Sequence, residues 1–89
     1  MADSTPELPV RVGLLTAAPD RLLVALAAQA GLAFVVLDAE QTSLDPRRCA
    51  EVVALLAGTG TEVLVRVPDL TELTLVSYAN TGADELVLP

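Results

Sequence analysis

The chain has 89 residues, which suits one small domain and falls well short of the roughly 250 residues of a closed eight-stranded α/β barrel. Its formal net charge is -7, and all five basic residues are arginine, so it lacks the clustered positive charge that nucleic-acid binding requires. One cysteine, Cys49, and no histidine exclude an internal disulfide and a zinc site of the usual ligands. We therefore expect a reducing, cytoplasmic environment and no nucleic-acid partner.

Two regions at the start of the chain bear on targeting. Residues 1–9 are polar and contain proline, and we interpret them as a flexible leader before an ordered domain over residues 10–89. Acidic side chains in this leader argue against a secretory signal. The apolar stretch from Leu22 to Leu37 is shorter than the about 20 residues of a membrane-spanning helix, and Gly31 divides it. We expect no membrane segment.

Strands and helices are predicted to alternate along the remaining chain. The predicted strands cover residues 10–15, 34–38, 63–67 and 86–88. The helices between them start at Pro19 with Asp20, at Asp45 with Pro46, and at an Asp69 and Glu72 capping box. They end before Gly31, Gly58 and Gly82, respectively. The resulting order is βαβαβαβ.

Apolar stripes on the predicted helices indicate how they cover a sheet. The inward residues we expect are Leu22, Leu26 and Ala30 with Leu23 and Ala27; Cys49, Val53, Leu56 and Ala57; and Leu73, Val76 and Ala79. Continuously apolar strands, such as residues 34–37, indicate burial on both faces of a parallel sheet. This α/β pattern fits half of a (β/α)8 barrel and an open doubly wound sheet equally well.

Polar side chains concentrate where the predicted strands end, which is where α/β proteins bind ligands. Asp38, Glu40 and Gln41 follow the second strand, and Arg66 interrupts the apolar third strand. Arg66 either pairs with an acid of the neighbouring strand and does nothing else, or holds a substrate carboxylate with its planar donors. Thr42 and Ser43 form a polar loop that is a further candidate for ligand contact.

Several segments together resemble one protein family. They are Gly13-Leu14-Leu15, Ala30 through Glu40, Val65-Arg66-Val67-Pro68, and Gly82 through Pro89. In order and spacing they resemble the HpcH/HpaI aldolase and citrate lyase family over residues 12–89. The resemblance implies the N-terminal half of a (β/α)8 barrel. It also implies a class II aldolase, a carbon–carbon lyase that acts on 2-keto acids such as pyruvate through an enolate, with Mg²⁺, Mn²⁺ or Co²⁺.

The resemblance assigns roles to four positions. Arg66 corresponds to the arginine that contacts the keto acid, and Asp38 to the acid that supports the catalytic base. Glu40-Gln41 stands where the family has a Glu-His pair, and a glutamine amide cannot take up a proton as imidazole does. The family's metal-binding acids come from later strands, so no metal ligand is named in this chain.

We therefore expect an aldolase-like half-barrel that is catalytically inactive or impaired on its own. The alternative is a non-enzymatic binding or assembly module, or a partner of a full-length aldolase. A third alternative is a longer product that supplies the missing strands. Because the first and fourth strands would leave unpaired edges, we also expect a homo-oligomer or a complementary barrel half as partner.

Overall fold

A computed structural model of the chain describes residues 10–40 and 42–89. The predicted leader, residues 1–9, and the candidate residue Gln41 lie outside this described part. The elements in chain order are β1 (Gly13–Thr16), α1 (Arg21–Gln29), β2 (Phe34–Asp38), α2 (Pro46–Leu56), β3 (Glu62–Arg66), α3 (Glu72–Ala79) and β4 (Glu85–Val87). The predicted βαβαβαβ order is confirmed.

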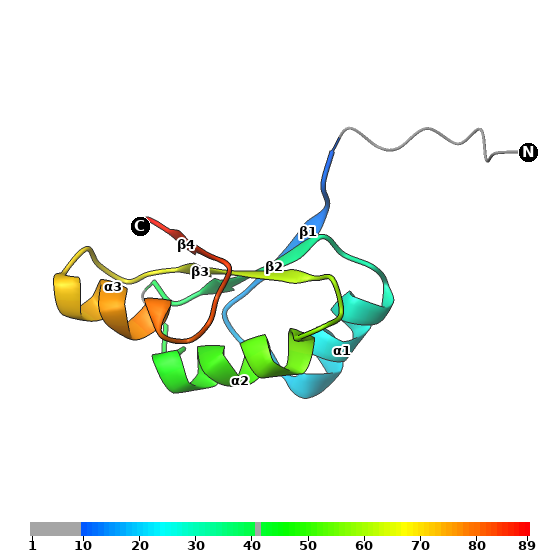
Figure 1. The fold of residues 1–89 in the computed structure, drawn as a ribbon, viewed down its shortest axis with the longest axis horizontal. Coiled ribbons are helices and arrows are strands. Elements are labelled where there is room, and N and C mark those ends of the chain that lie inside the picture. The colour runs from blue at the N-terminus through cyan, green and yellow to red at the C-terminus, as the bar shows by residue number, and fades with distance from the viewer. Residues whose placement is uncertain (1–9, 41) are drawn as a thin grey trace, which may run out of the picture.

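The described strands form one parallel sheet in the order β1-β2-β3-β4. Each strand therefore pairs with the next along the chain, and the helices all lie on one side of the sheet (Figure 1). A doubly wound sheet would reverse its strand order and place helices on both sides. Of the two architectures open from the sequence, the structure shows the partial (β/α)8 barrel.

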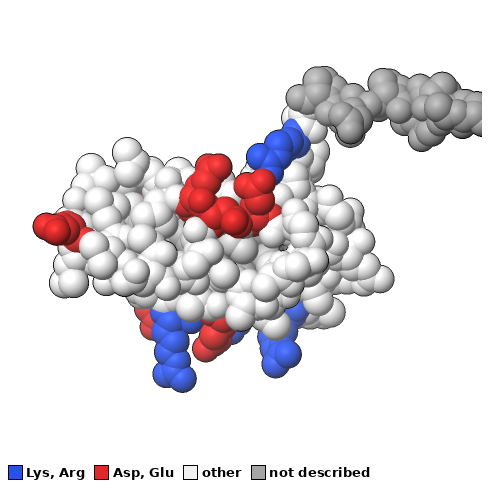
Figure 2. Space-filling model, viewed as in Figure 1, with Lys and Arg blue, Asp and Glu red and all other residues white. Residues whose placement is uncertain are grey.

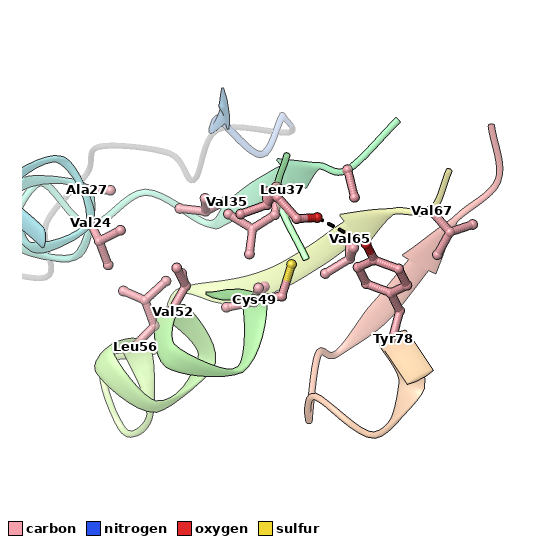
Figure 3. Packing of buried hydrophobic residues seen from close by; sticks show 13 residues of the cluster. Val24, Ala27, Val35, Leu37, Cys49, Val52, Leu56, Val65, Val67 and Tyr78 are labelled. Atoms are coloured by element: carbon pink, nitrogen blue, oxygen red, sulfur yellow. Dashed lines mark hydrogen bonds between the residues drawn. The ribbon is translucent and has the colours of Figure 1, made fainter. Parts of the chain in front are cut away.

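The core lies between the sheet and α2. Val35 and Leu37 of β2 and Val65 of β3 point toward this helix, which contributes Cys49 and Val52 (Figure 3). Burial of these apolar surfaces, at about 25 cal/mol per Å², is the main stabilising contribution to the domain.

A second contact closes the core beside α3. The Tyr78 hydroxyl donates a hydrogen bond to the Leu44 carbonyl oxygen at 3.0 Å, as Figure 3 shows for the tyrosine. This bond ties α3 to the loop that leads from β2 into α2. The loop that follows the carboxyl end of β2 is therefore held by α3 as well as by its own connection to α2.

Burial on both faces of the strands, expected from their apolar runs, is wrong for this sheet. In β2 and β3 fully buried residues alternate with partly buried ones, because helices cover only one face. Leu15, Val36 and Leu64 are aligned across the uncovered face, and Leu15 is 61% exposed. The structure thus has an apolar sheet face that no described element covers.

The predicted inner face of α1 is right only in part, and that of α3 is wrong. In α1, Ala27 is buried and Leu23 partly buried as expected, but Leu22, Leu26 and Ala30 are exposed and Val24 is buried in their place. In α3, Leu73 is 79% exposed, and the buried residue is Tyr78; the other two expected inward residues, Val76 and Ala79, are exposed as well. Both helices carry apolar residues around most of their circumference, so the periodicity does not distinguish the covered face.

The inner face of α2 is confirmed in part. Cys49 and Leu56 are buried as expected, but Val52 takes the central place, Val53 is partly buried and Ala57 is exposed. Arg47, Arg48 and Glu51 mark the polar side of its first two turns, which makes its buried face easier to recognise.

Helix starts follow the predicted chemistry with two corrections. Asp45 caps α2 and Pro46 opens it, as expected. Asp20 is the N-cap of α1, so Pro19 precedes the helix instead of lying in its first turn. Thr71, not Asp69, caps α3. Asp69 instead accepts a hydrogen bond from the Thr71 amide at 2.9 Å.

The strand boundaries differ from the predicted ones by small shifts. The third and fourth strands each start and end one residue earlier than expected, and the first begins at Gly13 instead of residue 10.

Within the described residues, no helix is long and apolar enough to cross a membrane.

Candidate functional site

The candidate site lies where β2 and β3 end. Asp38 is the last residue of β2, Arg66 is the last residue of β3, and the two are register partners in the parallel pair. Their chain neighbours Leu37 and Val65 are buried toward the helices. Since side chains alternate along a strand, Asp38 and Arg66 share the uncovered face of the sheet.

Asp38 and Arg66 form a two-point ion pair. Arg66 Nε donates to Asp38 Oδ1 at 3.1 Å, and Arg66 Nη2 donates to Asp38 Oδ2 at 2.6 Å. The Arg66 hydrogen bond lowers the pKa of the Asp38 carboxyl, and the same bond raises the pKa of the guanidinium. Both groups are therefore charged near neutral pH, and the pair fixes the plane of the guanidinium.

The ion pair leaves part of the guanidinium unused. Among residues 10–40 and 42–89, no group accepts a hydrogen bond from Arg66 Nη1, and the Arg66 side chain is 39% exposed. The outer edge of the guanidinium, Nη1 with the second Nη2 hydrogen, can therefore receive a carboxylate in the usual two-point geometry.

Glu40 adds a second acid to this cluster. Its amide donates to Asp38 Oδ1 at 3.0 Å, and its side-chain Oε2 lies 3.7 Å from Arg66 Nε. Oε2 is buried, and no hydrogen-bond donor reaches it from the described residues. The structure therefore brings together three of the four predicted site residues, Asp38, Glu40 and Arg66. The fourth, Gln41, lies outside the described part.

The loop after β2 is held by Thr42. Its hydroxyl donates to the Asp38 carbonyl oxygen at 2.9 Å and accepts from the Leu44 amide at 3.2 Å. These bonds fix the turn that carries Glu40, so the described role of Thr42 is structural.

Ser43 faces a different place, a hollow of about 370 Å³ between this loop and the start of α1. Arg48 lines the same hollow and was not singled out from the sequence. Its Nη2 donates to the Pro19 carbonyl oxygen at 2.6 Å, and its Nη1 pairs with Glu51 at 2.6 Å. In the sequence, the feature that could have drawn attention to Arg48 was its place beside a second arginine in the first turn of α2. The hydrogen bonds of Arg48 make it a clamp between α1 and α2.

The cluster does not fit a divalent cation. Both Asp38 oxygens accept hydrogen bonds from Arg66, and the nearest Glu40 oxygen lies beside the same positive charge. In the described part of the chain, no group of three or more histidine, cysteine, aspartate or glutamate side chains is placed to hold a metal ion.

Cys49 is part of the core, as expected. Its side chain is fully buried, and burial raises the pKa of the thiol to about 11. The reactive thiolate is therefore scarce at neutral pH, and Cys49 is not a nucleophile in the folded chain.

Comparison with known proteins identifies structures that are similar in fold. No family model and no curated protein sequence matches the chain. Among solved structures, citrate synthase SbnG superposes with a TM-score of 0.78 at 23% identity, over 89% of this chain and 32% of that one. An HpcH/HpaI aldolase from Desulfitobacterium hafniense DCB-2 superposes with a TM-score of 0.77 at 25% identity, over 85% of this chain and 30% of that one.

These likenesses define the class of the fold. The chain has the fold of part of an aldolase-type (β/α)8 barrel and spans about a third of the length of the structures it matches. The resemblance to HpcH/HpaI aldolases that the sequence indicates is confirmed in fold by a solved member of that name. The roles of Asp38, Glu40, Gln41 and Arg66 are not tested by these superpositions.

Proposed function

We propose that this chain forms the keto-acid-binding part of an aldolase-type lyase, with Arg66 receiving the carboxylate of a small 2-keto acid such as pyruvate. The observation that carries the proposal is the geometry of Arg66. Asp38 holds one edge of the guanidinium at the end of β3, the side chain is 39% exposed, and no described residue accepts a hydrogen bond from Nη1, which leaves the outer edge for a ligand. The likeness to an HpcH/HpaI aldolase supports this chemistry.

The ion pair with Asp38 supports the binding role. An arginine oriented beforehand loses less side-chain entropy when it binds a carboxylate than a mobile one does. The two interpretations left open by the sequence, a structural pair and a carboxylate fork, are therefore compatible because they use different edges of the same group. Asp38 acts here as a positioning residue.

Turnover is expected to be impaired. Gln41 stands where the family has its histidine base, and an amide has no useful proton affinity near neutral pH. The family resemblance implies a divalent metal, Mg²⁺, Mn²⁺ or Co²⁺, which would stabilise the charge of an enolate oxygen. The described residues do not form a site for it, so this chain's contribution is to bind and orient the keto acid.

The proposed role of Arg66 is tested by measuring pyruvate binding with ligand-observed NMR titration. Arg66→Ala should weaken binding by at least tenfold, because it removes a charge-assisted two-point contact. Arg47→Ala is the matched control, because this substitution removes the same charge from α2, where the Arg47 side chain is 91% exposed. Equal pyruvate affinity in the parent and in Arg66→Ala would leave only the structural ion pair.

Deuterium exchange at the pyruvate methyl group distinguishes an enzyme from a non-enzymatic binding module. Exchange above that of the metal alone, with Mn²⁺ or Mg²⁺ and abolished by EDTA, would show that the protein enolises pyruvate. Binding that persists in EDTA without exchange would identify the non-enzymatic module.

The uncovered sheet face favours assembly as a second function. The apolar row of Leu15, Val36 and Leu64 is only partly shielded from solvent, and β1 and β4 are the edges of the described sheet. We propose that a second copy or a complementary barrel half covers this face.

The buried, unpaired thiol of Cys49 agrees with a cytoplasmic location.

A further inference from the structure

The apolar row on the uncovered sheet face ends in a charge at one edge of the sheet. The register aligns Leu15 of β1 with Val36 of β2, then Leu64 of β3, and finally Glu85 of β4. Glu85 is exposed, and β4 is an edge of the described sheet. No described residue forms an ion pair with the Glu85 carboxylate. This edge therefore presents a negative charge beside an apolar surface.

The opposite edge of the sheet carries a positive charge. Arg11 lies just before β1, where the Ala33 amide donates to the Val12 carbonyl oxygen at 2.8 Å and extends the strand pairing. Because side chains alternate along a strand, Arg11 lies on the same face as Leu15. Its Nη2 donates to Glu62 at 2.9 Å, but no described residue accepts a hydrogen bond from its Nε or Nη1. The Arg11 side chain is 59% exposed, so these donors are open to a further acceptor.

The geometry of a closed barrel relates these two edges. In a (β/α)8 barrel, a row followed at right angles to the strands returns to its first strand displaced by about eight residues. The twist of the strands directs this shift toward lower residue numbers. If a two-fold axis runs along the barrel, half of the shift, about four residues, falls in each half. A row that starts at Leu15 and ends at Glu85 then continues at Arg11 of a second copy.

We propose that a second copy of this chain covers the uncovered face and closes a barrel, with β4 of each copy pairing in parallel with β1 of the other. Glu85 of one copy forms an ion pair with Arg11 of the other at both seams. This inference rests on the proposed assembly through the uncovered face and adds its partner and its orientation. Because the strands all run in one direction, the Arg66 clusters of both copies lie at the same end of the barrel.

The charges at the edges favour this arrangement over a sandwich of two sheets. A sandwich would bury the apolar rows of both copies but would leave the edge strands β1 and β4 unpaired. In the closed barrel the apolar rows are buried as well, and the edge strands pair with each other. Glu85 and Arg11 each meet the opposite charge only when the edges meet.

The dimer dissociation constant, measured by sedimentation equilibrium on the full chain, tests the seam. Glu85→Arg and Arg11→Glu should each raise this constant at least about tenfold, because like charges then meet at both seams. The double variant Arg11→Glu/Glu85→Arg restores opposite charges and should return the constant to the parent value. Glu72→Arg makes the same charge change at the exposed start of α3 and should leave the constant unchanged.

The double variant also separates loss of the seam from misfolding, because a variant that misfolds is not rescued by a second charge reversal. If the parent dimerises but Glu85→Arg weakens the dimer no more than Glu72→Arg does, or if the double variant fails to restore it, the seam is wrong. In either case the proposed coverage of the sheet face stands. A monomeric parent overturns both the seam and the coverage, whereas pyruvate binding by Arg66 is measured independently of either.

Discussion

At the scale of single residues, the charge of one carboxylate organises the candidate site. Asp38 accepts two hydrogen bonds from Arg66 and a third from the Glu40 amide. The same carboxylate thus orients the guanidinium and fixes the start of the loop after β2. Because the Arg66 hydrogen bond lowers its pKa, Asp38 stabilises the folded state wherever it is charged.

This coupling predicts a pH-dependent effect of Asp38→Asn on stability. The folded-state pKa of Asp38 lies below its ordinary value of 3.8, so its stabilising effect is complete above that pH and is lost as the pH falls through the folded value. The variant should be less stable than the parent at pH 7, and the difference should narrow below pH 3.8. Urea denaturation at several pH values measures this difference in the free energy of unfolding. A difference that stays constant to pH 3 or lower would contradict the coupling.

At the scale of elements, α2 is the helix that forms the core together with the sheet. It buries Cys49, Val52 and Leu56, and its N-cap Asp45 accepts a hydrogen bond from the Arg48 amide at 2.8 Å. The amphipathic pattern and the cap both agree with the predicted helix. In α1 the start at Asp20 was correct, whereas the predicted Asp69 cap of α3 was not, and the apolar faces of both helices were predicted less well because their exposed sides are apolar too.

The cap of α2 can be tested by Asp45→Ala. Removal of an N-cap side chain leaves a helix amide without its acceptor and should lower the free energy of unfolding by about 1 kcal/mol. Arg47→Ala, on the exposed side of the same helix, should change it by less than about 0.5 kcal/mol. Urea denaturation monitored by circular dichroism compares the two. Equal effects would mean that the cap contributes no specific stabilisation.

At the scale of the whole molecule, the chain has two unlike sides. The helices cover one face of the sheet, and basic side chains with acidic ones between them project from that side (Figure 2). Acidic side chains gather on the sheet side beside a basic one, and an ion pair of Arg11 with Glu62 lies at 2.9 Å. Between this pair and the Arg66 cluster runs the apolar row of the uncovered face.

This asymmetry predicts association through the uncovered face. The parent should elute above its monomer mass in size-exclusion chromatography, and Leu15→Ser should shift it toward the monomer, because it places a hydroxyl in the apolar row. Leu73→Ser is the control, since Leu73 is exposed on α3, away from the sheet. A monomeric parent, or an equal effect of both variants, would show that this face does not drive association.

The local sequence determined the alternation of strands and helices, the caps at Asp20 and Asp45, and the placement of Asp38 and Arg66 at strand ends. These features depend on residue spacing and on hydrogen bonds within a few residues. Only the tertiary structure decided between a barrel-type and a doubly wound sheet, and only it showed which faces of α1 and α3 are buried. It also separated the paired edge of Arg66 from the edge that no described residue contacts, and it showed that Glu40 Oε2 is buried without a donor among the described residues. Those outcomes depend on contacts between segments far apart in the chain, for which the local pattern carries no distance information.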